Sequence, residues 1–173
     1  MKGCDRLVDV GRRHFLRGGA LATAGAAAAT VLPGEAKARP TPARVEYPSN
    51  RLANVSQLKP NAPMEISYPD KGSPGVLIKL GTRVQGGSGP DGDIVAFSTL
   101  CPHKGFPLSY SAGDKTLNCP GHYSRFDCEK SGLQIMGQAT QNLPQFTLRI
   151  AANGDIFAEG VDELIYGRLS NVL

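Results

Sequence analysis

Short apolar segments, punctuated by Gly, Pro and Asn, make up the chain after residue 40. No stretch there repeats its apolar positions every 3.6 residues, as an amphipathic helix does, and the only helical expectation is a short turn near Val55–Leu58. Val76–Leu80 and Phe146–Ile150 have the apolar, β-branched content of half-buried strands. The predicted strands are Arg44–Tyr47, Met64–Tyr68, Val76–Leu80, Ile94–Ser98, Phe146–Ala151 and Asp155–Glu159. Many short strands joined by such turns predict an all-β fold, an antiparallel sandwich or barrel.

Three connections between these strands carry further information. Asn153-Gly154 is the strongest hairpin signal in the chain. Gly81–Asp93 is rich in glycine but lacks the Gly-Lys-Ser/Thr of a phosphate loop, so we expect a long hairpin or a loop shaped for a partner. Residues 99–145 interrupt the strand pattern, which predicts a small subdomain inserted between two core strands.

The first 38 residues have the organisation of an export signal. A twin-arginine pattern, Arg12–Arg17, precedes a weakly apolar run, Gly18–Leu32, and an A-x-A cleavage site at Ala36–Ala38. A basic segment, a short apolar segment and a small-residue site indicate secretion, and the paired arginines indicate the twin-arginine route. We therefore expect residues 1–38 to be a signal segment and residues 39–173 to form a periplasmic domain.

The apolar run also leaves room for a weak membrane tether, although it is shorter than the roughly 20 residues that span hydrocarbon.

The signal segment carries most of the net positive charge of the chain. It holds six of the 19 Lys and Arg residues and three of the 15 Asp and Glu residues, which leaves 13 against 12. The exported domain is therefore nearly neutral, and this balance gives no indication of nucleic-acid binding.

Two loops each combine a cysteine with a histidine. Cys101 is followed by His103, and Cys119 is followed by His122. Two Cys and two His are the ligand set of a Rieske [2Fe–2S] centre, in which two imidazoles replace two thiolates on one iron. The same residue types can hold structural zinc, but zinc sites usually pair like ligands within each segment. The mixed pairs favour the iron–sulfur interpretation, with the thiolates on the inner iron and the imidazoles on the outer one.

Residues 101–127 resemble the Rieske motif, with Cys-x-His-x-Gly in the first loop and Cys-Pro-x-His-x-Ser in the second. The resemblance implies a Rieske-type antiparallel β sandwich or barrel with an inserted cluster-binding subdomain. It also implies a [2Fe–2S] cluster, whose ligands would be Cys101, His103, Cys119 and His122.

Three further features match the family. Gly105 matches the glycine of the first loop. Ser124 matches the serine of the second loop, whose hydroxyl donates to a bridging sulfide in the high-potential members. Residues 137–145 resemble the third, proline-containing loop that covers the cluster.

The chain departs from the respiratory members of this family at three positions. Phe106 and Gly121 stand where those proteins have the two cysteines of a loop-to-loop disulfide, and we expect Phe106 to pack in place of that bond. Phe126 stands where the high-potential members have a tyrosine that donates to a ligand sulfur. Cys128, the cysteine left over after residue 38, is expected to be a free, partly buried thiol.

The whole exported region is similar to the small subunits of bacterial arsenite oxidases. The segments that carry this likeness are Gly81–Ser98, Cys101–Leu108, Cys119–Asp127 and Gly137–Phe146. The resemblance implies a heterodimer with a large subunit that holds a molybdopterin-type cofactor and a [3Fe–4S] cluster and oxidises arsenite. Electrons would then leave through the Rieske centre to a periplasmic cytochrome c or a blue copper protein.

Two other functions stay open from the sequence alone. One is a Rieske subunit of a membrane quinol–cytochrome complex, and the other is a zinc-stabilised binding module. No catalytic set for substrate chemistry stands out in the sequence, so we expect any enzyme activity to belong to a complex. Gly81–Asp93 is a candidate for docking the large subunit.

A substitution at Phe126 tests the predicted loss of a hydrogen-bond donor. Because hydrogen bonds to the cluster and its ligands favour the reduced state, Phe126→Tyr should raise the midpoint potential of the centre. The measurement is a redox titration of the loaded protein, followed by electron paramagnetic resonance. An unchanged midpoint would contradict this account of the position.

Overall fold

The structure is a computed structural model that describes residues 46–172, and its regular elements are almost entirely β-strands. In chain order they are β1 (Asn50–Asn54), η1 (Val55–Gln57), β2 (Pro63–Ser67), β3 (Pro74–Lys79), β4 (Ile94–Ser98), β5 (Ser109–Ser111), β6 (Thr116–Asn118), β7 (Arg125–Asp127), β8 (Leu133–Met136), β9 (Phe146–Ile150) and β10 (Asp155–Val161). The described residues contain no α-helix. The all-β fold class predicted from the sequence is confirmed.

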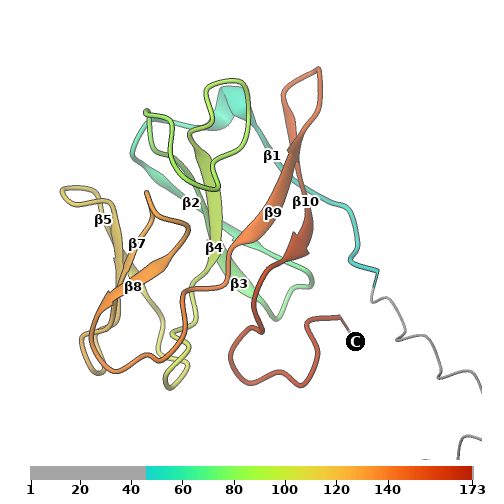
Figure 1. The fold of residues 1–173 in the computed structure, drawn as a ribbon. Coiled ribbons are helices and arrows are strands. Elements are labelled where there is room, and N and C mark those ends of the chain that lie inside the picture. Colours follow the sequence, from blue (N-terminus) through green and yellow to red (C-terminus); the bar gives the residue numbers. More distant parts are fainter. Residues whose placement is uncertain (1–45, 173) are drawn as a thin grey trace, which may run out of the picture. The chain divides into compact units, whose positions relative to one another are not determined.

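The strands form three antiparallel sheets with the orders β1-β10-β9, β2-β3-β4 and β5-β6-β7-β8. Figure 1 shows β5, β7 and β8 on the left, β1, β9 and β10 on the right, and β3 and β4 between them. The four-stranded sheet, here called the cluster sheet, is formed wholly by residues that lie between β4 and β9 in the chain.

The central sheet, β2-β3-β4, is buried on both faces at its strands β3 and β4. Val76 pairs with Phe97, whereas the next pair along the strands, Leu77 and Ala96, faces the opposite way because side chains alternate. The first pair belongs to a core cluster that includes residues of the cluster sheet. The second pair belongs to another core cluster, which includes residues of β1, β9 and β10. The two hydrophobic cores of the described domain therefore share one sheet.

This double burial corrects one expectation from the sequence. Residues 76–80 were expected to be half-buried, yet only Lys79 among them escapes full burial. All five residues of β4 are buried as well. A strand covered on both faces shows a continuous apolar run instead of alternation. The burial of β9 does alternate, as predicted for this strand.

The predicted strands from Met64 onward correspond to β2, β3, β4, β9 and β10, each within two residues of its predicted ends. The strand predicted at residues 44–47 is wrong as far as it is described, because Glu46 and Tyr47 belong to no strand, and its first two residues lie outside the described range. The strands β1 and β5 to β8 were not predicted. They are short, and tertiary pairing decides their structure.

Two of the turns predicted from the sequence have the expected form. In the β9–β10 hairpin, Gly154 has a φ of 83°, and its N–H donates to the Ala151 carbonyl over 2.9 Å. The helical turn predicted near residues 55–58 is the single turn η1, which the Asn54 side chain caps by accepting from the Ser56 N–H.

The glycine-rich segment between β3 and β4 folds back on itself as a long hairpin. Leu80 N–H donates to the Asp93 carbonyl over 2.8 Å, and Val84 N–H donates to the Gly92 carbonyl over 2.9 Å. At the base of the hairpin, Lys79 forms an ion pair with the Asp93 carboxylate at 3.0 Å. The long-hairpin alternative therefore describes this segment, and its role in docking a partner stays a prediction.

The predicted signal segment, residues 1–38, lies outside the described residues. Among residues 46–172, no helix is long and apolar enough to cross a membrane.

Gly75 on β3 tests how tightly the layers are packed. A Cβ at this position would lie 2.6 Å from Cε2 of Phe146 and 2.9 Å from the Phe97 carbonyl oxygen. Gly75→Ala should therefore destabilise the domain by about 1–3 kcal/mol, the usual cost of overpacking a core. The matched control is Gly113→Ala, where a Cβ would meet nothing within 4 Å. Thermal unfolding followed by circular dichroism measures both, and equal melting temperatures would contradict the packing described here.

Candidate metal centre

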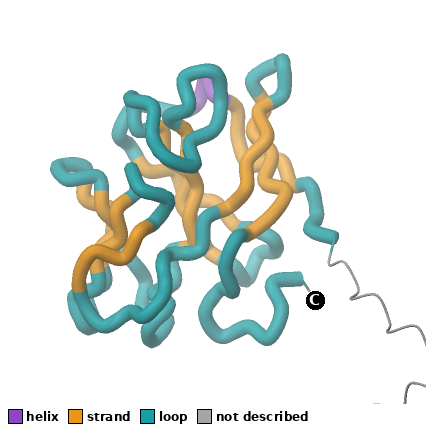
Figure 2. Tube along the Cα trace, in the orientation of Figure 1, coloured by secondary structure: helices purple, strands orange, loops and turns teal. Residues whose placement is uncertain are grey.

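The topology of the cluster sheet brings three loops to one of its ends. Neighbouring strands run antiparallel, so the start of β5, the end of β6 and the end of β8 lie at the same end of the sheet. The loops at these three points are residues 99–108, 119–124 and 137–145. They are irregular backbone, drawn in teal in Figure 2. The first two are the predicted ligand loops, and the last is the predicted third loop.

The first ligand loop follows directly from the buried strand β4. Leu108 N–H donates to the Thr99 carbonyl over 2.8 Å, which closes the loop. Inside it, Cys101 N–H donates to the Phe106 carbonyl over 2.9 Å, and Gly105 N–H donates to the Cys101 carbonyl over 2.8 Å. Gly105 has a φ of 69°, a left-handed conformation that glycine adopts without strain. These bonds fix the turn that carries the first histidine.

The second ligand loop is a tight connection between β6 and β7. Cys119 N–H donates to the Ser124 carbonyl over 2.8 Å, one residue beyond the last pair of the two strands. The loop therefore continues the ladder of the strands by one bond and then turns through Gly121 and His122. Tyr123 near the end of the loop has a positive φ of 59° and is exposed.

The two cysteines lie together in the core. Cys101 and Cys119 are buried and belong to the same core cluster. Burial raises the pKa of the Cys101 thiol, the N–H of His103 lowers it, and the neighbouring Cys119 thiol raises it again. Backbone N–H groups that point at a cysteine sulfur stabilise its thiolate, which is the form that binds metal.

The two histidines lie together closer to the surface. Their ring centroids are 4.7 Å apart with the rings at 75°, and His122 is exposed. Nδ1 of His103 is buried and has no hydrogen-bond partner among the described residues. A buried ring nitrogen without a partner costs free energy unless something else binds it, and a metal ion would satisfy it.

This donor set fits a two-iron cluster. The thiols are paired on the inside and the imidazoles on the outside, as two irons with different ligands require. Each iron of such a cluster needs only two protein ligands. Among residues 46–172, no group of three His, Cys, Asp or Glu side chains gathers around a single metal position.

The position of the missing disulfide is filled by an aromatic ring. A Cβ at Gly121 would lie 2.9 to 3.1 Å from ring atoms of Phe106. The same ring meets His122 edge to face, with the centroids 5.9 Å apart. Phe106 therefore packs between the two ligand loops, as expected from the sequence, and remains 43% exposed on its outer side.

The third loop packs against Ser124. The buried Ser124 Oγ accepts the N–H groups of Gln138 and Ala139 over 3.1 and 3.0 Å. Gly137 lies so close that a Cβ there would be 2.5 Å from the Ser124 nitrogen and 2.7 Å from the Tyr123 oxygen. Because both lone pairs of the hydroxyl are used, its proton remains free to donate to a further acceptor. This geometry is compatible with the sulfide-bonding role that the resemblance implied for Ser124.

Two other expected positions lie in the core beside the site. Phe126 on β7 is fully buried and belongs to the same core cluster as the two cysteines. Cys128 is a free thiol that is fully rather than partly buried, and burial raises its pKa to about 12. A thiol with such a pKa stays protonated at neutral pH and is unreactive. Cys128 is therefore a core residue.

One residue of the site escaped the sequence analysis. A Cβ at Gly105 would lie 2.5 Å from Cδ1 of Tyr166, so this ring covers the backbone of the first ligand loop. Tyr166 lies far along the chain, beyond β10. The signal in the sequence was Gly167, a residue that is common in turns but does not say what the turn contacts.

Stacked antiparallel sheets with two paired Cys–His loops define a small β protein that holds an iron–sulfur centre. The chain belongs to the Rieske family, because the family model of the Rieske [2Fe–2S] domain matches residues 49–147. The cofactor of this domain is a [2Fe–2S] cluster. The family match therefore favours the iron–sulfur interpretation of the two Cys–His pairs over the zinc-stabilised module that the sequence left open.

Two curated relatives span nearly the whole chain. The iodate reductase subunit IdrB of Denitromonas iodatirespirans is 40% identical over 172 residues, which cover 98% of this chain and 90% of the relative. The iodate reductase subunit IdrB of Pseudomonas sp. strain SCT is 38% identical, over 90% of this chain and 81% of the relative. Both names differ from the arsenite oxidase suggested by the motif resemblance.

A solved structure supports the fold. The soluble domain of the Rieske protein II (soxF) from Sulfolobus acidocaldarius superposes with a TM-score of 0.63 at 23% identity, covering 73% of this chain and 85% of that one. The Rieske-type antiparallel fold expected from the sequence is therefore confirmed.

Ser124 gives a test of how the third loop is held. Ser124→Ala removes the acceptor of two N–H groups, one of them buried, which should cost about 1–3 kcal/mol of stability. Amide hydrogen exchange in residues 137–141 should also become faster. The control is Ser109→Ala, because Ser109 is an exposed residue of β5. Unchanged exchange in the third loop would show that the two hydrogen bonds do not hold it.

Proposed function

We propose that Cys101 and Cys119 bind one iron of the [2Fe–2S] cluster and that His103 and His122 bind the other. The observation that supports this assignment is the sorting of the four side chains, with the thiols buried together and the imidazoles adjacent near the surface. When bound, the cluster takes up and releases one electron. The protein excludes water from the thiolates and leaves His122 accessible to a redox partner.

We further propose that the chain is the electron-transfer subunit of a heterodimeric molybdenum oxidoreductase. The likeness to arsenite oxidase small subunits supports a large molybdopterin subunit with a [3Fe–4S] cluster. The two relatives that span this chain are named as subunits of iodate reductases, which supports a complex that acts on an oxyanion. Iodate is the substrate favoured by these relatives, and arsenite is the one favoured by the motifs.

The location and the soluble partner are part of the same proposal. The twin-arginine pattern of residues 1–38 supports export of the folded, loaded protein to the periplasm, with at most a weak membrane tether. There, a cytochrome c or a blue copper protein would exchange electrons with the exposed His122 edge. The hairpin of residues 81–93 remains a candidate contact for the large subunit.

A Rieske subunit of a membrane quinol–cytochrome complex is the alternative drawn from the sequence. Respiratory members of that kind keep the loop-to-loop disulfide, and this chain has Phe106 and Gly121 at those positions. The two relatives that cover most of the chain are named as iodate reductase subunits, and neither name refers to a cytochrome complex. The molybdenum complex is therefore the function that we favour.

Purification from the periplasm of the native host tests this assignment. We expect a large second chain to co-purify, with molybdenum in the complex, and we expect the complex to turn over iodate or arsenite with a redox dye. Assays with each substrate decide between the two. A Rieske protein that purifies without molybdenum, or together with membrane cytochrome subunits, would contradict the proposal.

Substitution of the proposed ligands tests the site within the same complex. Cys119→Ser and His122→Ala should each abolish the Rieske signal, because each removes one of two protein ligands from an iron. Cys128→Ser is the matched control, since Cys128 is a buried thiol outside the proposed ligand set, and the cluster signal should persist. A cluster retained in Cys119→Ser, or lost only in Cys128→Ser, would reassign the ligands.

A further inference from the structure

The chain segment after β10, residues 162–172, lies at the same end of the domain as the ligand loops, at the bottom of Figure 1. This segment, here called the C-terminal strap, lies beyond the residues 49–147 that the Rieske family model matches. It contains no strand, yet Ile165 and Asn171 within it are buried. A segment without regular structure that buries specific residues is held by specific contacts, and these contacts indicate what it does.

The contact with the first ligand loop is made by a turn at the tip of the strap. Arg168 N–H donates to the Ile165 carbonyl over 3.2 Å, and Gly167 has a φ of 80°, the conformation of a type II turn. Tyr166 occupies the first central position of this turn. One edge of its ring lies against Gly105, where a Cβ would approach Cδ1 to 2.5 Å, while 40% of the residue stays exposed on its outer side. Only a glycine at position 105 allows the ring this close to the loop backbone.

Both sides of the turn are anchored. Ile165 is 1% exposed and belongs to the core shared with β1, β9 and β10. The Ile165 N–H donates to Oδ1 of Asn171 over 2.9 Å. The amide of Asn171 in turn donates to the Glu163 carbonyl over 2.9 Å and to the Tyr47 hydroxyl over 3.1 Å. The buried Asn171 side chain thus joins the strap to itself and to the start of the described chain.

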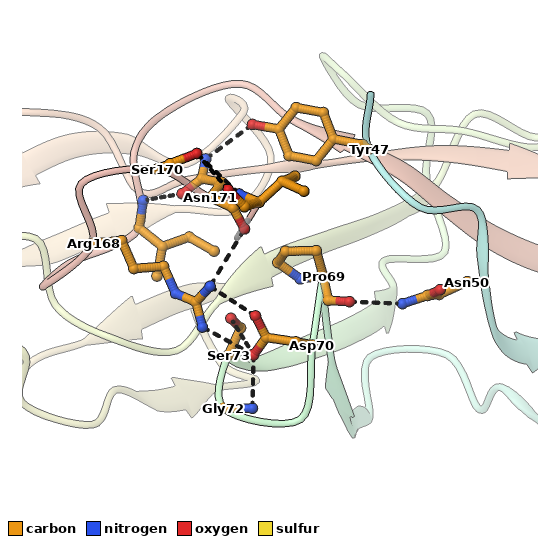
Figure 3. Close-up of polar contacts among 11 residues, drawn as sticks. Tyr47, Asn50, Pro69, Asp70, Gly72, Ser73, Arg168, Ser170 and Asn171 are labelled. Carbon is orange, nitrogen blue, oxygen red and sulfur yellow. Dashed lines mark hydrogen bonds and ion pairs between the residues drawn. The ribbon is translucent and has the colours of Figure 1, made fainter. Parts of the chain in front are cut away.

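A charge pair fixes the other side of the turn to the connection between β2 and β3. The Arg168 guanidinium donates to both oxygens of Asp70, at 2.7 and 2.9 Å, as Figure 3 shows. The same carboxylate accepts from the Gly72 N–H over 2.8 Å. The Arg168 guanidinium is the main reason that the pKa of Asp70 lies below its ordinary value. A bidentate pair of this kind fixes direction as well as distance.

The strap also contacts the third loop. Gln145 N–H donates to Oδ1 of Asp162 over 2.7 Å, and Asp162 N–H donates to the Gln145 carbonyl over 3.2 Å. The Gln141 amide reaches the Leu164 carbonyl at 3.4 Å. One segment therefore touches the first ligand loop and the third loop, while its anchors lie in the second hydrophobic core and in the β2–β3 connection.

From these contacts we infer that the C-terminal strap positions the first ligand loop, with Tyr166 as the residue that holds the loop and shields its backbone at Gly105 from water. The inference rests on the proposed assignment of Cys101 and His103 as ligands. Tyr166 acts through the backbone at Gly105, so it is a positioning residue.

The ring should affect the electron affinity of the site. Reduction adds one negative charge, and an environment that excludes water disfavours the more highly charged state. Solvent exposure is one of the factors that set the potential of iron–sulfur centres. Removing the ring should therefore raise the midpoint potential. It should also free the loop and accelerate loss of the cluster, since the loop would lose a contact that orients its ligands.

The test compares Tyr166→Ala with Tyr166→Phe in the purified, cluster-loaded complex. Tyr166→Ala should shift the midpoint potential to a more positive value and should release the cluster to a chelator about tenfold faster. Tyr166→Phe keeps the ring, so its midpoint potential and its rate of cluster release should equal those of the unsubstituted protein. Leu169→Ala is a second control in the strap. Because Leu169 is fully exposed, this variant should leave the midpoint potential and the release rate unchanged.

A variant outside the ring contact keeps the test decisive if Tyr166→Ala does not accumulate. Arg168→Met removes the charge pair with Asp70 and leaves the Tyr166 and Gly105 residues unchanged. It should increase amide hydrogen exchange in residues 99–108 and shift the midpoint in the same direction. A purely structural role of the pair would lower the melting temperature and leave the midpoint of the loaded protein unchanged, which would overturn the inference.

The outcomes separate this inference from the ligand assignment on which it rests. If the unsubstituted protein holds a Rieske cluster and Tyr166→Ala matches it in midpoint and release rate, the strap has no positioning role. If Cys101→Ser or His103→Ala retains the cluster, the ligand assignment fails, and the inference fails with it. A positive shift in Tyr166→Ala that is absent from Tyr166→Phe, together with loss of the cluster in Cys101→Ser and His103→Ala, supports both.

Discussion

The burial of the central sheet on both faces is the constraint on which the rest of the structure depends. Strands β3 and β4 present one set of side chains to the cluster sheet and the other set to β1, β9 and β10. Neither outer sheet could bury its apolar face without this shared layer. Strand β4 is buried along its whole length and runs directly into the first ligand loop. It therefore also fixes where the loop that carries Cys101 begins.

The ligand loops are held by packing and backbone hydrogen bonds in place of a covalent link. Phe106 fills the space between the loops, and its contact with Gly121 is possible only because that residue has no side chain. Ser124 joins the second loop to the third by accepting two N–H groups. A cluster bound at the four proposed ligands would join the same loops again, and its binding would then be coupled to the folding of this end of the domain.

The arrangement suits a protein that transfers electrons for a partner. The thiols lie in the core, whereas His122 and the outer side of Phe106 are accessible at the surface. Exposure on one side allows a partner to approach, and burial on the other keeps water from the thiolates. The C-terminal strap, which lies beyond the residues that the family model matches, connects the first ligand loop and the third loop to the second hydrophobic core.

The sequence by itself determined the all-β class, the position of five strands and the [2Fe–2S] cofactor. Local patterns were sufficient there, because strand content, turn residues and the spacing of Cys and His are visible within short segments. The tertiary structure alone decided how many layers cover β3 and β4, where β1 and the strands of the cluster sheet pair, and that Tyr166 meets Gly105. Those features depend on contacts between residues far apart in the chain, whose partners no local pattern specifies.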